Sequence, residues 1–261
     1  FRSDRSLFSV SGDFTFNPDT QTIISYSPHA SKDVVIPEAI NGVEVLHIGD
    51  NAFANHQLTS VVIPDTVLTI GNSAFDNNLG LTSVKMSSRV ELIGDRAFSG
   101  SKQLATITLN EGLTSIGSSA FSQSGLTSIT LPDSVTEIGK GAFQNCGSLT
   151  EVNLNDQITA IPDYVFSRTS ITKLVVPASV KTIGESAFSH ISSLKEVTFN
   201  EGLESIGEKA FESSGIEELV LPDSLTSINA YAFKEVRRLY DVTFGANLTR
   251  IGTGAFLNAG L

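Results

Sequence analysis

The fold is decided by the stretch Leu126-Thr-Ser-Ile129-Thr-Leu131-Pro-Asp-Ser-Val135-Thr-Glu-Ile138-Gly139-Lys-Gly-Ala142-Phe143, because the chain repeats it many times. With x for any residue, the pattern is L-x-x-[IV]-x-[LIF]-[PN]-x-x-[VL]-x-x-I-G-x-x-A-F. Its last residue recurs every 22 or 23 positions, at Phe53, Phe75, Phe98, Phe121, Phe143, Phe166, Phe188, Phe211, Phe233 and Phe256. A fixed period of this length predicts a solenoid, in which each copy buries its apolar residues against its neighbours.

Each copy begins with apolar residues that alternate with polar ones, as Ile129 and Leu131 do. This spacing predicts a short strand with one buried face, which Pro or Asn then ends. The I-G dipeptide predicts a sharp turn at which a Cβ is unfavourable. We expect the Ala-Phe pair to fill the middle of the coil, where burying each Phe is worth roughly 1.5–3 kcal/mol.

A longer period of 45 residues overlies the repeat from Leu104 onward. Copies of one type have 22 residues and Asn or Gly after the strand, and those of the other type have 23 residues and Pro. The first type begins at Leu104, Leu149, Leu194 and Leu239, and the second at Leu126, Ile171 and Ile216. The alternation indicates that pairs of repeats were duplicated.

The ends of the chain differ from the repeats. Within residues 1–30, two apolar segments flank the turn-forming stretch Asn17-Pro18-Asp19-Thr20, which predicts an N-terminal β-hairpin that caps the solenoid. Residues 31–261 then form about ten repeats, and an insertion at Asn41-Gly42 in the first repeat predicts a tight turn. The chain stops at the first position of a further repeat, so we expect the C-terminal end to be truncated.

Composition excludes several classes of function. A net charge of −11 disfavours nucleic acid and anionic membrane surfaces, which both select for Lys and Arg. The single cysteine, Cys146, allows no internal disulfide and no cysteine metal cluster. The chain has no apolar run long enough to span a bilayer, and its four histidines are scattered. The sequence predicts no catalytic residue, no metal ligand and no cofactor.

The repeat resembles the BspA-like leucine-rich repeats, the type with I-G-x-x-A-F in its second half. This resemblance implies a strand-rich α/β solenoid, a right-handed superhelix with a concave parallel sheet and short turns, 3-10 or helical segments on the convex side. It also implies a monomeric extracellular or cell-surface protein, usually bacterial, that adheres to host or matrix proteins. The Asn of the general leucine-rich pattern, three places after the last strand residue, is absent, so no buried Asn ladder is expected.

In a solenoid the strand residues that point away from the core form a continuous surface, where we expect a partner to bind. These candidates are Ser128, Thr130, Glu151, Asn153, Lys173, Val175, Glu196, Thr198, Glu218, Val220, Asp241 and Thr243. The acids among them favour a basic partner, although an exposed sheet also needs charged residues for solubility. Arg237, Arg238 and Tyr240 are a second candidate, because Arg and Tyr are favoured at interface hot spots, although Arg237 could instead pair with a neighbouring carboxylate.

The prediction is therefore a non-catalytic protein-binding or adhesion module that uses its concave face. A structural stalk that displays another domain is an alternative, which the regular duplication suits. A glycan-binding module is another, but the outward rows of the strands contain no aromatic residues. An enzyme fits least well, because no unique polar cluster interrupts the repeats.

Overall fold

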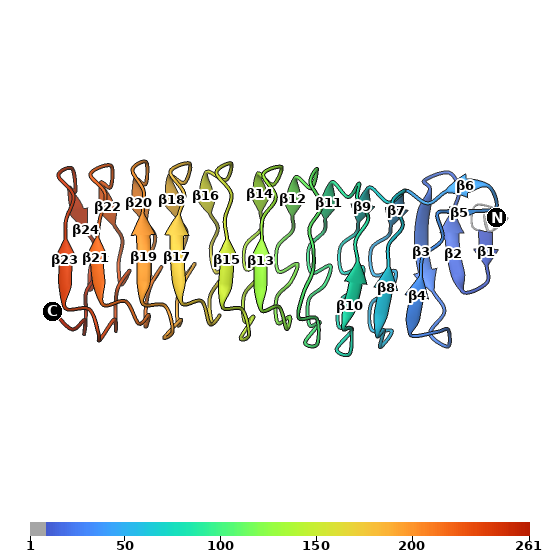
Figure 1. Cartoon of the computed structure of the whole chain (residues 1–261), viewed down its shortest axis with the longest axis horizontal. Coiled ribbons are helices and arrows are strands. Elements are labelled where there is room, and N and C mark those ends of the chain that lie inside the picture. The colour runs from blue at the N-terminus through green and yellow to red at the C-terminus, as the bar shows by residue number, and fades with distance from the viewer. Residues whose placement is uncertain (1–8) are drawn as a thin grey trace, which may run out of the picture.

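Each copy of the repeat forms one coil, and the coils lie side by side along the long axis, with the N-terminal hairpin at one end and the C-terminus at the other (Figure 1). The computed structural model describes residues 9–261. The first strand of a coil lies in one row of parallel strands. This row comprises β4 (Asp33–Val35), β8 (Ser60–Val62), β10 (Ser83–Lys85), β13 (Ser128–Thr130), β15 (Glu151–Asn153), β17 (Lys173–Val176), β19 (Glu196–Phe199), β21 (Glu218–Val220) and β23 (Asp241–Thr243).

A second row of parallel strands is formed by the residues just before the I-G turn. It comprises β7 (His47–Ile48), β9 (Thr69–Ile70), β11 (Leu92–Ile93), β12 (Ser115–Ile116), β14 (Glu137–Ile138), β16 (Ala160–Ile161), β18 (Thr182–Ile183), β20 (Ser205–Ile206), β22 (Ser227–Ile228) and β24 (Arg250–Ile251). A glycine follows in eight of these ten coils, where adjacent coils approach closely, and Pro162 and Asn229 stand there in the other two. A Cβ on Gly139 would lie 2.2 Å from the backbone nitrogen of Ser118 in the preceding coil.

The helical segments expected on the convex side are not confirmed, because residues 9–261 contain turns there and no helix, so the fold is a strand-rich β-solenoid. The reason lies in two left-handed residues that flank Ala-Phe in each coil, such as Ser119 (φ 54°) and Gln123 (φ 58°). A helix requires φ near −60° throughout, so it cannot pass these positions. The N–H groups of Ser119, Phe121 and Gln123 instead donate to carbonyl oxygens of the next coil, at 2.8–3.0 Å.

The core is a column of ten phenylalanine rings, one from each coil. From Phe53 to Phe256 the rings form nine successive stacked pairs, with centroids 5.0–5.6 Å apart and interplanar angles of 3–16°. All but Phe256 are fully buried. The repeated phenylalanine of the sequence therefore forms a column that runs along the long axis of the molecule.

The N-terminal end of this column lies against the hairpin. Strands β2 (Phe14–Asn17) and β3 (Thr22–Tyr26) are antiparallel, β1 (Ser9–Ser11) pairs with β2, and β3 continues the second strand row by pairing with β7. The ring of Tyr26 lies 5.2 Å from that of Phe53, between centroids. In the first coil, β5 (Ala39–Ile40) and β6 (Val43–Glu44) form the tight turn expected at Asn41-Gly42, with both turn residues at positive φ.

Alternate coils also carry an inward-facing asparagine at the end of their first apolar segment. The side-chain amides of Asn110, Asn155 and Asn200 donate to backbone carbonyl oxygens of the preceding coil, at 2.7–2.8 Å for the shortest bond of each. Only Asn155 of the three is buried, and they lie two coils apart without bonding to one another, so they form no continuous Asn ladder. These asparagines directly follow the last apolar residue of the segment (Leu109, Leu154 and Phe199), where the general leucine-rich pattern does not have its Asn.

Candidate interaction surface

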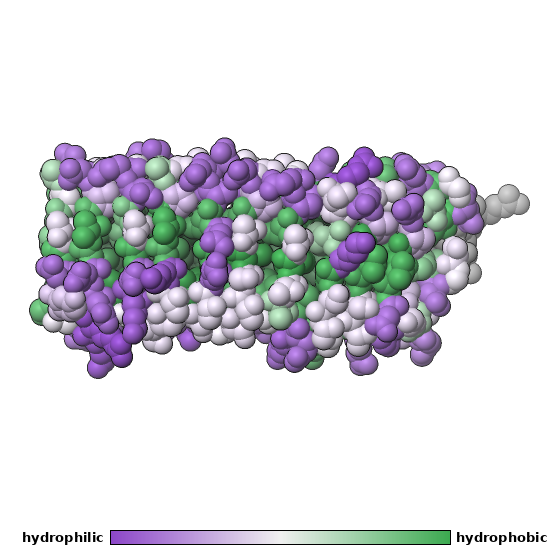
Figure 2. All heavy atoms as spheres, viewed as in Figure 1, coloured by the Kyte–Doolittle hydropathy of each residue, from purple (hydrophilic) through white to green (hydrophobic). Residues whose placement is uncertain are grey.

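The outward-facing residues of the first strand row form one continuous surface, which we call the strand face. It carries large apolar side chains that are exposed to solvent. The exposed fractions are 69% for Val35, 58% for Val175 and 66% for Val220. Tyr240 and Phe244, beside β23, are 61 and 48% exposed. Figure 2 shows a hydrophobic band along the molecule where Figure 1 draws this strand row, crossed by a few hydrophilic side chains, with a hydrophilic upper border and a pale to hydrophilic lower one.

From β13 onward the strand row is divided into pairs, whereas β4, β8 and β10 form one three-stranded sheet. Hydrogen-bonded ladders join β13 to β15, β17 to β19 and β21 to β23, whereas β15 and β17 belong to separate sheets, as do β19 and β21. Strands within a pair are 23 residues apart, as Ser128 and Glu151 are, and strands of successive pairs are 22 residues apart, as Glu151 and Lys173 are. From β13 onward the ladder is thus interrupted where the connection is one residue shorter.

A groove lies at each of three 22-residue connections in the row. Groove A, about 470 Å³, lies between the segment Ile107–Leu109 and β13. Groove B, about 550 Å³, lies between β15 and β17, and groove C, about 610 Å³, lies between β19 and β21. The three grooves therefore recur with the 45-residue period, two coils apart.

Equivalent side chains form the walls of the three grooves. One wall carries Thr108, Asn153 or Thr198, and the facing wall carries Thr130, Val175 or Val220. Every groove is also bordered by at least two carboxylates. These are Glu111 and Asp133 in groove A, Glu151 and Asp156 in groove B, and Glu196, Glu217 and Glu218 in groove C.

The basic residues near the grooves do not offset all of these acids. The ammonium of Lys173, in groove B, lies 3.3 Å from Glu196 on the paired strand β19, so the ion pair spans the ladder. Lys195 borders groove C together with three acids. Groove A is consequently bordered by two acids and no lysine. Groove B has two acids and one lysine, and groove C has three acids and one lysine.

The predicted acidic row is partly bonded within the protein. Glu151 accepts a hydrogen bond from the amide of Asn153 at 3.1 Å, and Glu218 accepts one from the hydroxyl of Tyr240. The latter bond raises the pKa of Tyr240, because ionisation would place a phenolate against the carboxylate. Asp241 lies directly opposite Glu218 in the ladder, so two like charges face each other at this end of the strand face.

The structure brings all twelve predicted strand residues to the exposed side of their strands. The candidates Arg237 and Arg238 lie elsewhere, beside Glu235 in a shallow depression, where Arg237 contacts that carboxylate at 2.7 Å. Sequence reasoning missed the grooves and the exposed Val35 and Phe244. The alternation of 22- and 23-residue copies was the available signal for the grooves.

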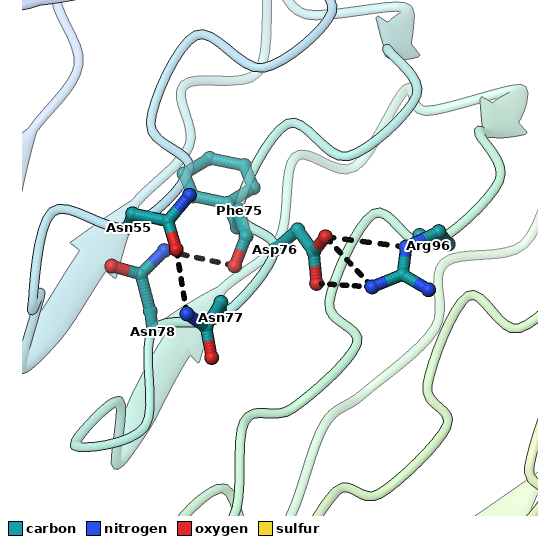
Figure 3. A network of polar contacts seen from close by, with 6 residues as sticks. All are labelled: Asn55, Phe75, Asp76, Asn77, Asn78 and Arg96. Carbon is teal, nitrogen blue, oxygen red and sulfur yellow. Dashed lines mark hydrogen bonds and ion pairs between the residues drawn. The ribbon is translucent and has the colours of Figure 1, made fainter.

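Several buried polar side chains outside the strand face are bonded within the fold, although the hydroxyls of Ser101 and Ser214 are buried without a partner. Figure 3 shows one such network on the side of the phenylalanine column, in which the amide of Asn78 donates to the carbonyl oxygen of Phe75 at 2.8 Å. Asn78 also bonds to Phe53 and Leu58. Cys146 occupies the equivalent place in a later coil, is fully buried and contacts the carbonyl oxygen of Phe121.

Within residues 9–261, no three His, Cys, Asp or Glu side chains are arranged to hold a metal ion. The same residues include no helix with the length and hydrophobicity needed to cross a membrane.

Comparison with known proteins places these features in a family. The family model "BspA type Leucine rich repeat region (6 copies)" matches residues 46–170 and 159–261. A solved leucine-rich repeat protein of T. pallidum (TpLRR) is 27% identical with a TM-score of 0.58, over 82% of this chain and 89% of that one. One from Bacteroides ovatus is 23% identical with a TM-score of 0.52, over 96% and 90%. No curated protein matches. The chain belongs to the BspA-type leucine-rich repeat family.

Proposed function

We propose that the strand face binds another protein, and that the chain is a non-catalytic adhesion or interaction module of a secreted or cell-surface bacterial protein. The observation that carries the proposal is the exposed apolar band of Val35, Val175, Val220, Tyr240 and Phe244. Contiguous exposed apolar surface bordered by polar residues is typical of protein-binding sites. The family resemblance supports a host or matrix protein as the partner and a location outside the cell.

The twelve strand residues are the proposed contacts, and the net negative charge of the chain favours a basic partner. Tyr240 is proposed as a hot spot, because it is an exposed aromatic residue beside groove C. Arg237 and Arg238, in the depression beside Glu235, are proposed as a second contact that is separate from the strand face.

The test is capture of extracellular proteins on the immobilised chain. A strand-face variant has Glu151, Glu196, Glu218 and Asp241 changed to Ser, and a charge-matched control has exposed acids off the strand face changed to Ser. The control acids are Glu91, Glu137, Glu204 and Glu208. We expect the first variant to lose the captured protein and the control to retain it. Equal capture by both variants would refute a role for the strand face, and antibody labelling of intact cells tests the location.

A structural spacer is the second candidate, favoured by the phenylalanine column that runs through every coil. Deleting one 45-residue pair, residues 149–193, shortens the column and keeps the register of the remaining coils. If the chain is a spacer, the deletion should shorten the distance at which an attached domain is held. If it is a binding module, the deletion should lower the affinity for its partner protein, because groove B is lost.

A further inference from the structure

The grooves deepen the proposed function, on which this inference rests, because they define the spacing of a ligand. Strands in a sheet lie about 4.8 Å apart, so grooves two coils apart are separated by about 10 Å. The stacked phenylalanine rings, at 5.0–5.6 Å, give a similar spacing for the coils. A ligand that fills all three grooves must present the same kind of group about every 10 Å along the molecule.

Each groove is suited to a long side chain with an apolar stem and a cationic end. The wall formed by Thr130, Val175 or Val220 offers methyl groups, and the borders offer carboxylates. Lys and Arg place an aliphatic stem along apolar surface while the charged end reaches polar groups. Arg also matches carboxylates through two parallel hydrogen bonds.

A polypeptide presents side chains at this spacing in the polyproline II conformation. That helix rises about 3.1 Å per residue with three residues per turn, so every third side chain lies on one side, about 9.3 Å apart. In a β-strand, residues three apart point to opposite faces, so a strand cannot fill successive grooves with that spacing. Proline rings between the cations would lie on the exposed Val175, Val220 and Tyr240.

We propose that the strand face binds an extended, proline-rich segment of a partner protein that carries Lys or Arg at every third position. The segment lies along the long axis, across the strands, with one cation in each of grooves A, B and C. The 45-residue duplication then has a functional meaning, since each duplicated pair adds one binding groove.

Synthetic peptides test the spacing. A labelled peptide of about four Arg-Pro-Pro repeats is compared, by fluorescence anisotropy at low salt, with a peptide of the same composition whose arginines are clustered. We expect the periodic peptide to bind at least about tenfold more tightly, because it engages several grooves at once. Equal affinities would show that charge alone attracts the peptide and would overturn the proposal, as would absence of binding. A helical peptide with Arg at every seventh residue, about 10.5 Å apart, is a second control, and its tighter binding would also overturn it.

Groove-filling variants test the location. Val175→Arg and Val220→Arg each place a cation in one groove, whereas Leu92→Arg introduces the same charge at an exposed apolar position of β11, off the strand face. We expect the two groove variants to weaken the periodic peptide about fivefold each and the control variant to leave its affinity within about twofold. Equal weakening by all three would overturn the proposal. If strand-face variants abolish partner capture while the periodic peptide fails to bind, this inference fails and the proposed function stands.

Discussion

The side-chain amide of Asn155 donates to the carbonyl oxygen of Pro132 in the preceding coil, at 2.7 Å. The same amide donates to Val135 at 2.8 Å, and its oxygen accepts from the backbone nitrogens of Gln157 and Ile158. Asn200 likewise donates to Val176 of the preceding Pro-type coil, at 2.8 Å, whereas Asn110 donates to Val90 of a coil that has Ser87 in place of Pro. The turn that begins with Pro exposes carbonyl oxygens to the next coil, and the asparagine there satisfies them.

Asn155→Leu should therefore lower the free energy of unfolding by about 2–4 kcal/mol, because it leaves buried backbone groups without partners. Asn153→Ala is the matched control on the same strand. Its amide bonds only to exposed groups, Thr130 and Glu151, so the change should cost less than about 0.5 kcal/mol. Urea unfolding followed by circular dichroism measures both. A loss of similar size in the two variants would contradict a special role for the buried amide.

The phenylalanine column gives a second prediction. Phe143 stacks on Phe121 and Phe166, both at 5.4 Å between centroids, and is fully buried. Phe143→Ala should lower stability by about 3–5 kcal/mol, the usual range for removing a buried aromatic side chain. Phe256→Ala should cost less, because that ring is partly buried and stacks on Phe233 alone among the phenylalanines of the column. Thermal unfolding compares them, and an unchanged melting temperature for Phe143→Ala would mean that the ring contributes little to the stability of the core.

The sequence predicts what every coil shares and misses what depends on differences between coils. The sequence predicts that Phe143 lies in the core and that Val175 lies on the surface, because the periodicity of apolar residues indicates which side chains are buried. The turns could not be assigned correctly, because residues such as Ser119 and Gln123 carry no compositional sign of a left-handed backbone. Groove B depends on one residue fewer between Glu151 and Lys173, and the sequence shows that difference without showing that it interrupts a ladder.

The left-handed turn residues give a third prediction. Ser119 has φ 54°, where a β-branched side chain is strained and glycine is not. Ser119→Val should destabilise the protein by about 1–2 kcal/mol, and Ser119→Gly should be neutral or stabilising. Ser118→Val and Ser118→Gly are the controls at the adjacent position, which is not left-handed. Urea unfolding measures the stability of the four variants. An equal difference in the free energy of unfolding between Val and Gly at both positions would contradict a strained backbone at Ser119.

The contact between Tyr240 and Glu218 gives the last prediction. The carboxylate accepts the phenolic hydrogen and raises the pKa of Tyr240, so Glu218→Ala should lower that pKa toward its ordinary value of 10.0. A raised pKa means that the contact favours the folded state below the unfolded pKa, and that this contribution is lost as the pH rises through the folded pKa. Glu185→Ala is the matched control, since it removes the equivalent hydrogen bond from Tyr164. Ultraviolet difference titration in backgrounds with Tyr240 or Tyr164 changed to Phe assigns each transition. If Glu218→Ala left the Tyr240 transition in place, this side chain would be free to contact a partner.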